Sequence, residues 1–316
     1  MSVYSRITMG VLFLSLASAY SFAGQLSTDQ VSLELNVLKR DSDSNTIYLY
    51  NNNGTVNNSV DDIPLAGTGS FDANADTGYR LSGSKSINTH WSVNAGVLTS
   101  DLSKTDSFND PSSQLEIFRL PITANFDAAN SVSAAYSSKL QNIEVNAVYR
   151  YSDNLDLFAG VTQLKLDEQF RITSDDSLAA GIGVYTINTN NKLLGPQLGL
   201  SYSYKPNPKY SLYFTGKLAW LNNDARQDQV VNDSPTFTRN NSASGSHAST
   251  MYDARVGVNY YFVQNATLGL GYQYIKVTDV ALAESQFNTT SAGSNTLAVN
   301  DSISWSGFSL TLGYYF

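Results

Sequence analysis

The sequence contains no cysteine and only two histidines, His90 and His247. Without cysteine there is no disulfide framework, no thiolate metal site and no thiol nucleophile. Charged residues make up only 15% of the chain, and acids outnumber bases to give a net charge of −8. No basic stripe of the kind that follows a nucleic-acid backbone is present. We therefore expect no nucleic-acid partner, no metal and no other cofactor.

Long apolar runs are also missing after the first residues. No later stretch approaches the roughly 20 continuous apolar residues that a membrane-spanning helix needs, which excludes a helical membrane protein. The start of the chain differs, because Arg6 precedes an apolar and small run over residues 7–19, and two small-x-small sites follow, ending at Ala19 and Ala23. This layout is typical of a secretory signal peptide. We expect residues 1–23 to be removed on export, which leaves residues 24–316 as one domain.

The remaining sequence is rich in two-residue alternation. Near its end, Phe308, Leu310, Leu312, Tyr314 and Phe316 alternate with small or polar residues. A period of two places the apolar side chains on one face of a strand. Low charge combined with 20 tyrosines and 14 phenylalanines is typical of strands that cross a membrane. The pattern predicts an all-β protein, a transmembrane antiparallel up-and-down β-barrel.

Connection lengths indicate how the barrel is oriented. Short turns are predicted near Asn88, Asp153, Asn207 and Gln264, and long polar segments separate the other strand ends. In outer-membrane barrels the short turns are periplasmic and the long loops extracellular. Leu115 to Tyr136 either add a hairpin, giving twelve strands instead of ten, or fold inward as a constricting loop. The ten predicted strands cover residues 28–40, 76–86, 90–100, 132–151, 155–173, 184–204, 210–226, 249–262, 266–276 and 300–316, and the long polar segments, expected to be solvated, cover 41–75, 101–130, 174–183, 227–248 and 277–299.

The last strand resembles the recognition signal of outer-membrane barrels, because its apolar row runs through Leu312 and Tyr314 to Phe316. This resemblance implies the outer membrane of a Gram-negative bacterium, with outer-membrane lipid and the barrel-assembly machinery as partners. The alternative is the edge strand of a soluble β-sandwich. An exposed apolar edge would then favour aggregation, so the barrel is preferred.

A second resemblance covers the middle of the chain. The motifs that carry it are Glu144-x-Asn146, the run 155–161, Leu164-x-Leu166-x-Glu168 and Asn191-x-Leu193-x-Gly195-x-Gln197-x-Gly199. Together they resemble the outer-membrane β-barrel porin family, including its pore-forming major outer-membrane proteins. The resemblance implies passive transport and supplies no catalytic residue.

If the apolar faces contact lipid, the polar faces line the lumen. Barrels of about eight strands can be filled by side chains, whereas 16–18 strands leave a wide channel. A barrel of intermediate size is compatible with a narrow passive pore for ions and small polar solutes, which we favour. The alternative is a structural or surface-interaction barrel whose lumen is closed by interlocked charges. The predicted lining residues are Arg80, Glu144, Asn146, Arg150, Asp156, Gln197, Lys217, Asp253 and Arg255.

Other roles have less support in the sequence. His247 lies near Asp253 in the sequence, as a catalytic histidine and its orienting acid do in some barrel proteases and lipases. No serine signature or acid cluster accompanies this pair. We therefore expect no enzyme activity. An oligomer is compatible with the pattern, which identifies neither its interface nor the solute.

Deleting Phe316 should prevent insertion, because the terminal strand closes the barrel and ends on the expected recognition residue. The deleted protein should remain in the periplasm and be digested by added protease, as measured by cell fractionation and immunoblotting. Outer-membrane levels equal to those of the intact chain would contradict the insertion role of Phe316.

Overall fold

The computed structural model describes residues 29–44, 47–51, 63–68, 75–110, 115–117, 129–176, 181–233, 237–287 and 296–316. The expected signal peptide lies outside these residues and stays a prediction. Within them, no helix is long and apolar enough to cross a membrane.

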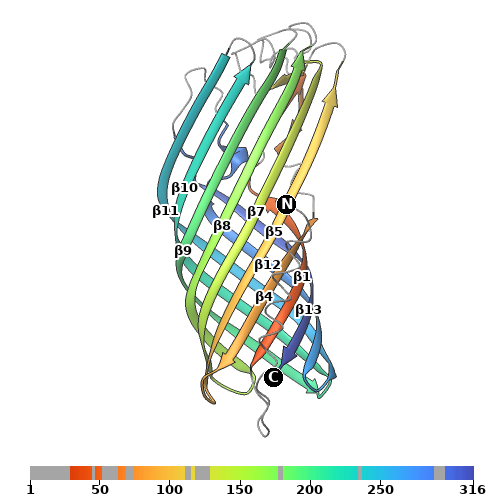
Figure 1. Ribbon diagram of the computed structural model, residues 1–316, viewed down its shortest axis with the longest axis vertical. Coiled ribbons are helices and arrows are strands. Elements are labelled where there is room, and N and C mark those ends of the chain that lie inside the picture. Colours follow the sequence, from red (N-terminus) through yellow and green to blue (C-terminus); the bar gives the residue numbers. More distant parts are fainter. Residues whose placement is uncertain are drawn as a thin grey trace.

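Ten strands form one closed antiparallel barrel (Figure 1). The ring closes where the first strand pairs with the last, from Gln30 opposite Tyr315 to Ser42 opposite Ile303. The ten-strand prediction is confirmed. In chain order the barrel strands are β1 (Gln30–Ser42), β4 (Ala75–Ser86), β5 (Trp91–Asn109), β7 (Ser131–Arg150), β8 (Leu155–Asp176), β9 (Gly181–Asn207), β10 (Tyr210–Asp233), β11 (Phe237–Val263), β12 (Ala266–Val280) and β13 (Asp301–Tyr315).

The predicted alternation holds along the lower part of each strand, near the short turns. On β12, Leu268 and Leu270 point outward and are exposed, whereas Thr267 and Gln273 point inward and are buried. Apolar side chains on the outside and polar ones inside reverse the arrangement of a soluble protein, because the outer face meets lipid. This is the apolar band of the barrel.

The barrel wall is much taller on one side. In Figure 1, β5 and β7–β11 extend well beyond β1, β4, β12 and β13. Above Met251, β11 pairs only with β10 among the described residues. The expected long loops at 174–183 and 227–248 were therefore wrong: β8 runs to Asp176, β9 starts at Gly181, and β10 and β11 reach Asp233 and Phe237. Above the membrane the outer face needs no apolar residues, so these extensions read as polar loops in the sequence.

Parts of the other long segments fold into the lumen. A small sheet of β2 (Ile47–Asn51), β3 (Ile63–Gly67) and β6 (Leu115–Ile117) and the 3-10 turn η2 (Ala283–Ser285) lie within the upper barrel (Figure 1). The prediction that residues 41–75, 101–130 and 277–299 would be solvated was therefore wrong for residues 47–51, Leu115, Ile117 and residues 280–287, which are buried or half-buried. It was also wrong for residues 101–109, which continue β5 in the wall, whereas Pro64 and Leu65 of β3 are exposed. The alternative of an extra hairpin at Leu115–Tyr136 was also wrong, because the closed barrel has ten strands. The inward fold holds for Leu115–Ile117, whereas residues 131–136 belong to the wall strand β7. Apolar residues in these segments, which include Tyr48, Leu49 and Ile117, gain burial by packing on the inner wall.

Replacing Val145 by Arg should destabilise the barrel by about 2–4 kcal/mol, because Val145 points outward within the apolar band. Ser137→Arg is the matched control. Ser137 also points outward from β7 but lies above the band, where the cost should be about 0–1 kcal/mol. Urea unfolding in lipid vesicles measures both free energies, and equal costs would contradict this position of the band.

Candidate functional site in the barrel lumen

The lower lumen holds a set of ionised side chains that we name the central charge cluster. It contains three acids and three bases carried by five strands, so its formal charges cancel. Its members are Glu34 of β1, Arg80 of β4, Glu144 of β7, Lys217 of β10, and Asp253 and Arg255 of β11.

Lys217 and Arg80 hold the cluster together across the lumen. The Lys217 ammonium lies 2.7 Å from Glu144 Oε2 and 3.1 Å from Asp253 Oδ2. The Arg80 guanidinium reaches Glu34 at 3.6 Å, Glu144 at 3.7 Å and Asp253 at 3.9 Å. Because β4 and β7 are not neighbours of β10 and β11 in the ring, these contacts connect separate parts of the wall.

Amide side chains add hydrogen bonds to two of the acids, Glu144 and Asp253. Gln197 donates to Glu144 at 3.1 Å and to the side-chain oxygen of Asn146 at 2.6 Å. Gln273 donates to Asp253 at 3.0 Å. Buried carboxylates are tolerated when such contacts replace the lost water.

The Tyr213 ring adds to the filling of the lumen. Gly257 and Gly271 leave room for it, since a Cβ added at either glycine would meet the Tyr213 hydroxyl. The inward glycines of β11 and β12 thus have a packing explanation.

Most of the predicted lining residues meet in or beside this cluster. Arg150 and Asp156 do not, because they form a half-exposed pair 3.9 Å apart at the periplasmic end. Glu34 was missed. The outward row Leu33, Leu35 and Val37 places Glu34 on the inner face, so the alternation contained the signal.

A second group of charges lies higher in the lumen, and we name it the upper ion-pair cluster. Fully buried Arg40 lies 3.3 Å from Glu168 and 3.0 Å from Glu284. Ser138 donates a hydrogen bond to Glu168 at 3.0 Å, and the Arg40 guanidinium lies 4.8 Å from the centre of the Tyr136 ring. The sequence could not reveal this cluster, because Glu284 belongs to a segment that shows no strand alternation.

The chain around η2 is bound to the inner wall. The Asn191 side chain both donates to the Ala281 carbonyl at 2.8 Å and accepts from the Ala281 N–H at 2.9 Å. The Ala283 N–H donates to Glu168 at 3.1 Å. Phe287 packs edge-on against Phe170 at 5.1 Å between ring centres. Polar and apolar contacts together hold this segment inside the barrel.

The lumen offers little for catalysis in the part that is described. No group of three acid, histidine or cysteine side chains there could hold a metal ion. His90 lies in the short turn between β4 and β5, where its ring stacks with that of Tyr149. His247 lies on β11 above the central charge cluster. The arrangement suits neutralisation of charge and filling of space.

Replacing Lys217 by Met should cost about 3–5 kcal/mol, because Glu144 and Asp253 keep their charges in a dry site. Adding Glu144→Gln should recover much of this loss, since the formal charges balance again. Unfolding free energies of the single and double variants give the coupling between the residues. Additive losses would mean that the two side chains do not act as a pair.

The family described as Legionella pneumophila major outer membrane protein precursor matches residues 30–316. No curated protein sequence matches the chain.

Several solved structures match most of the chain, each with a TM-score below 0.5. The outer membrane protease OmpT from Escherichia coli has 13% sequence identity and a TM-score of 0.47, over 94% of this chain and 99% of that one. The toluene transporter TodX from P. putida has 12% identity and a TM-score of 0.37, over 93% and 91%. A major outer membrane protein from Thermus thermophilus has 12% identity and a TM-score of 0.37, over 92% and 100%. The family match spans nearly the whole barrel, and we conclude that the chain is an outer-membrane β-barrel protein of the Legionella pneumophila major outer membrane protein family.

Proposed function

We propose that this protein is a structural and surface-interaction barrel whose lumen is closed in its resting state. One observation carries the proposal: five of the six side chains of the central charge cluster are buried, and the sixth, Arg255, is only 20% exposed. Glu34, Arg80, Glu144, Lys217 and Asp253 are each only 3–7% exposed. Side chains that line a water-filled channel would be far more exposed.

The upper lumen supports the same function. The small sheet and the chain around η2 pack their apolar residues against the inner wall, where Leu102, Tyr136, Phe170 and Tyr185 are all buried. A solute entering from outside would meet this core before it reached the central charge cluster. The core of the upper lumen and the central charge cluster form two successive layers, and each would block the passage of a solute.

The tall wall supplies the surface that would act instead. Its highest ribbon, formed by β10 and β11, exposes mainly uncharged polar side chains from Asn240 to Ser246. Such a ribbon stands clear of lipid and is accessible to molecules outside the cell. We propose that contacts with external partners are made there.

A narrow passive pore remains the second candidate, as the sequence favoured. The observation that supports it is the polar lining of the lower lumen, since a permanently closed barrel could be filled with apolar residues at less cost in desolvation. In this candidate the chain around η2 would have to leave the lumen, and small polar solutes or ions would then pass.

Refolded protein in a planar bilayer should show no regular single-channel steps in the resting state, because both layers fill the lumen. Recordings over a range of voltage and salt measure this. Uniform steps from the unmodified chain would reject the closed barrel and establish the pore candidate.

Cysteine labelling should place the tall wall outside the cell. The chain contains no cysteine, so each introduced thiol is the only one present. Ser242→Cys should react on intact cells with a PEG-maleimide too large to cross the outer membrane. Lys209→Cys, in the turn between β9 and β10, should react only after the membrane is permeabilised. The reverse pattern would contradict the orientation.

A further inference from the structure

The outer face of β7–β10 changes character at one height. Val145, Val161 and Leu198 are exposed in the apolar band. Its last row is mixed, because Ile143 of β7 and Leu194 of β9 alternate with Gln163 of β8 and Asn222 of β10. Two residues further up each strand, about 7 Å along the wall, begins a continuous polar row. This row, which we name the lysine row, consists of Gln141, Lys165, Lys192 and Asp224, each opposite the next across neighbouring strands.

Two lysines stand directly opposite each other in this row. Lys165 of β8 pairs in register with Lys192 of β9, and both point outward. Like charges in this position repel and destabilise a sheet. Asp167 binds Lys165 at 2.6 Å, but Lys192 and the nearby Lys139 form no ion pair within the described part of the chain. Asp224 and Asp167 lie opposite Lys192 and Lys139 in register, but neither lysine reaches a carboxylate at ion-pair distance. The Lys192 ammonium therefore remains available to an anion beside Lys165.

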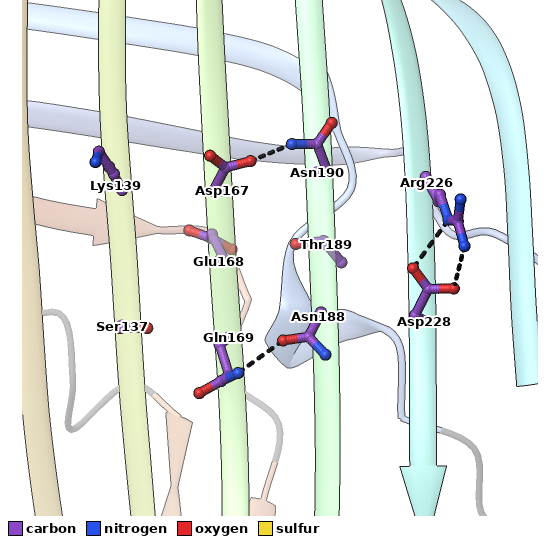
Figure 2. Close-up of a pocket in the computed structure, with 10 residues that line it drawn as sticks. All are labelled: Ser137, Lys139, Asp167, Glu168, Gln169, Asn188, Thr189, Asn190, Arg226 and Asp228. Carbon is purple, nitrogen blue, oxygen red and sulfur yellow. Dashed lines mark hydrogen bonds and ion pairs between the residues drawn. The ribbon is translucent and has the colours of Figure 1, made fainter. Parts of the chain in front are cut away.

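A polar hollow of about 380 Å³ lies immediately beyond the lysine row, on the side away from the apolar band. Figure 2 draws its lining residues, with the tall end of the wall toward the bottom of the view. Figure 2 shows hydrogen-bonding groups on neighbouring strands along it, including the Gln169–Asn188 pair at 2.8 Å and the Arg226–Asp228 pair at 2.8 Å. Lys139 and Asn190 complete this side of the hollow. Amides and charged groups arranged in this way can bind the hydroxyl groups of a sugar.

We propose that this wall binds a phosphorylated glycolipid of the outer leaflet. A phosphate group would lie between Lys165 and Lys192, and the sugar that carries it would occupy the hollow above. The acyl chains would then lie along the apolar band below Leu194. Charge complementarity and direct continuity with the band favour a lipid over a soluble anion.

The proposal depends on the orientation used for the proposed function, because the hollow faces the outer leaflet only if the tall wall is external. It is independent of whether the lumen conducts. Labelling of Ser242→Cys on intact cells therefore tests the orientation separately from the lipid site.

Lipid A, a bisphosphorylated glycolipid, is the probe, and native mass spectrometry of the purified full-length barrel measures its binding. Lys165→Gln/Lys192→Gln should weaken lipid A binding roughly 30-fold, since each lysine near an anionic lipid surface contributes about a factor of five. Dephosphorylated lipid A should bind the unmodified barrel about as weakly as lipid A binds the variant.

The matched control removes two outward lysines from the opposite wall. Lys39 of β1 and Lys276 of β12 are also outward-facing, but they lie opposite Ser306 and Ser304 instead of each other. Lys39→Gln/Lys276→Gln should change lipid A binding less than threefold. Equal weakening by both double variants would overturn the proposal, as would inorganic phosphate binding that competes fully with lipid A.

Thermal unfolding gives a second readout, because the change in melting temperature caused by Lys192→Gln should reverse its sign when lipid A is added. In detergent without phosphorylated lipid, Lys192→Gln should leave the melting temperature unchanged or raise it, because it removes the repulsion. With lipid A present, the same substitution should lower the melting temperature relative to the unmodified barrel. A loss of stability that is equal in both conditions would indicate a purely structural role and overturn the proposal.

Discussion

The rest of the structure depends on one constraint: within lipid, every backbone N–H and C=O group of a strand must find its partner inside the sheet. The ladder between β1 and β13 satisfies it by closing the ring. Closure with ten strands also limits the width of the lumen, so that side chains from separate parts of the wall meet. Charges on the inner face must then neutralise one another, and Lys217 between Glu144 and Asp253 does this across the lumen.

The barrel has two halves with opposite arrangements of polarity. In the lower half, polar side chains fill the inside and apolar ones face lipid. In the upper half, apolar residues such as Phe170 and Ile172 point inward and polar residues such as Gln169 and Arg171 point outward. The upper half is therefore organised like a soluble β-protein, and the inward segments supply the remainder of its core. The resting closure that we propose depends on both halves.

The boundary between the halves is itself a chemical surface. On β9, Leu194 contacts the lipid region, whereas Lys192 lies one full strand repeat above it. A wall that changes so abruptly must match a membrane that changes equally abruptly from acyl chains to charged headgroups. The lipid site that we propose would make the outer face and the lipids beside it complementary in both polarity and charge.

The sequence alone determined the fold class, the ten strands, the short turns and the inward face of most charged residues, because two-residue alternation is a local property. The same two-residue alternation also identifies Glu34 as an inward-facing residue. The local pattern could not show that residues 227–248 continue as strands, since above the membrane their outer face has no apolar requirement. It also could not place Glu284 beside Arg40, or fold β2 and β6 into the lumen. Those contacts join residues far apart in the chain, and only the closed tertiary structure brings them together, because burial against the inner wall exists only after the barrel has formed.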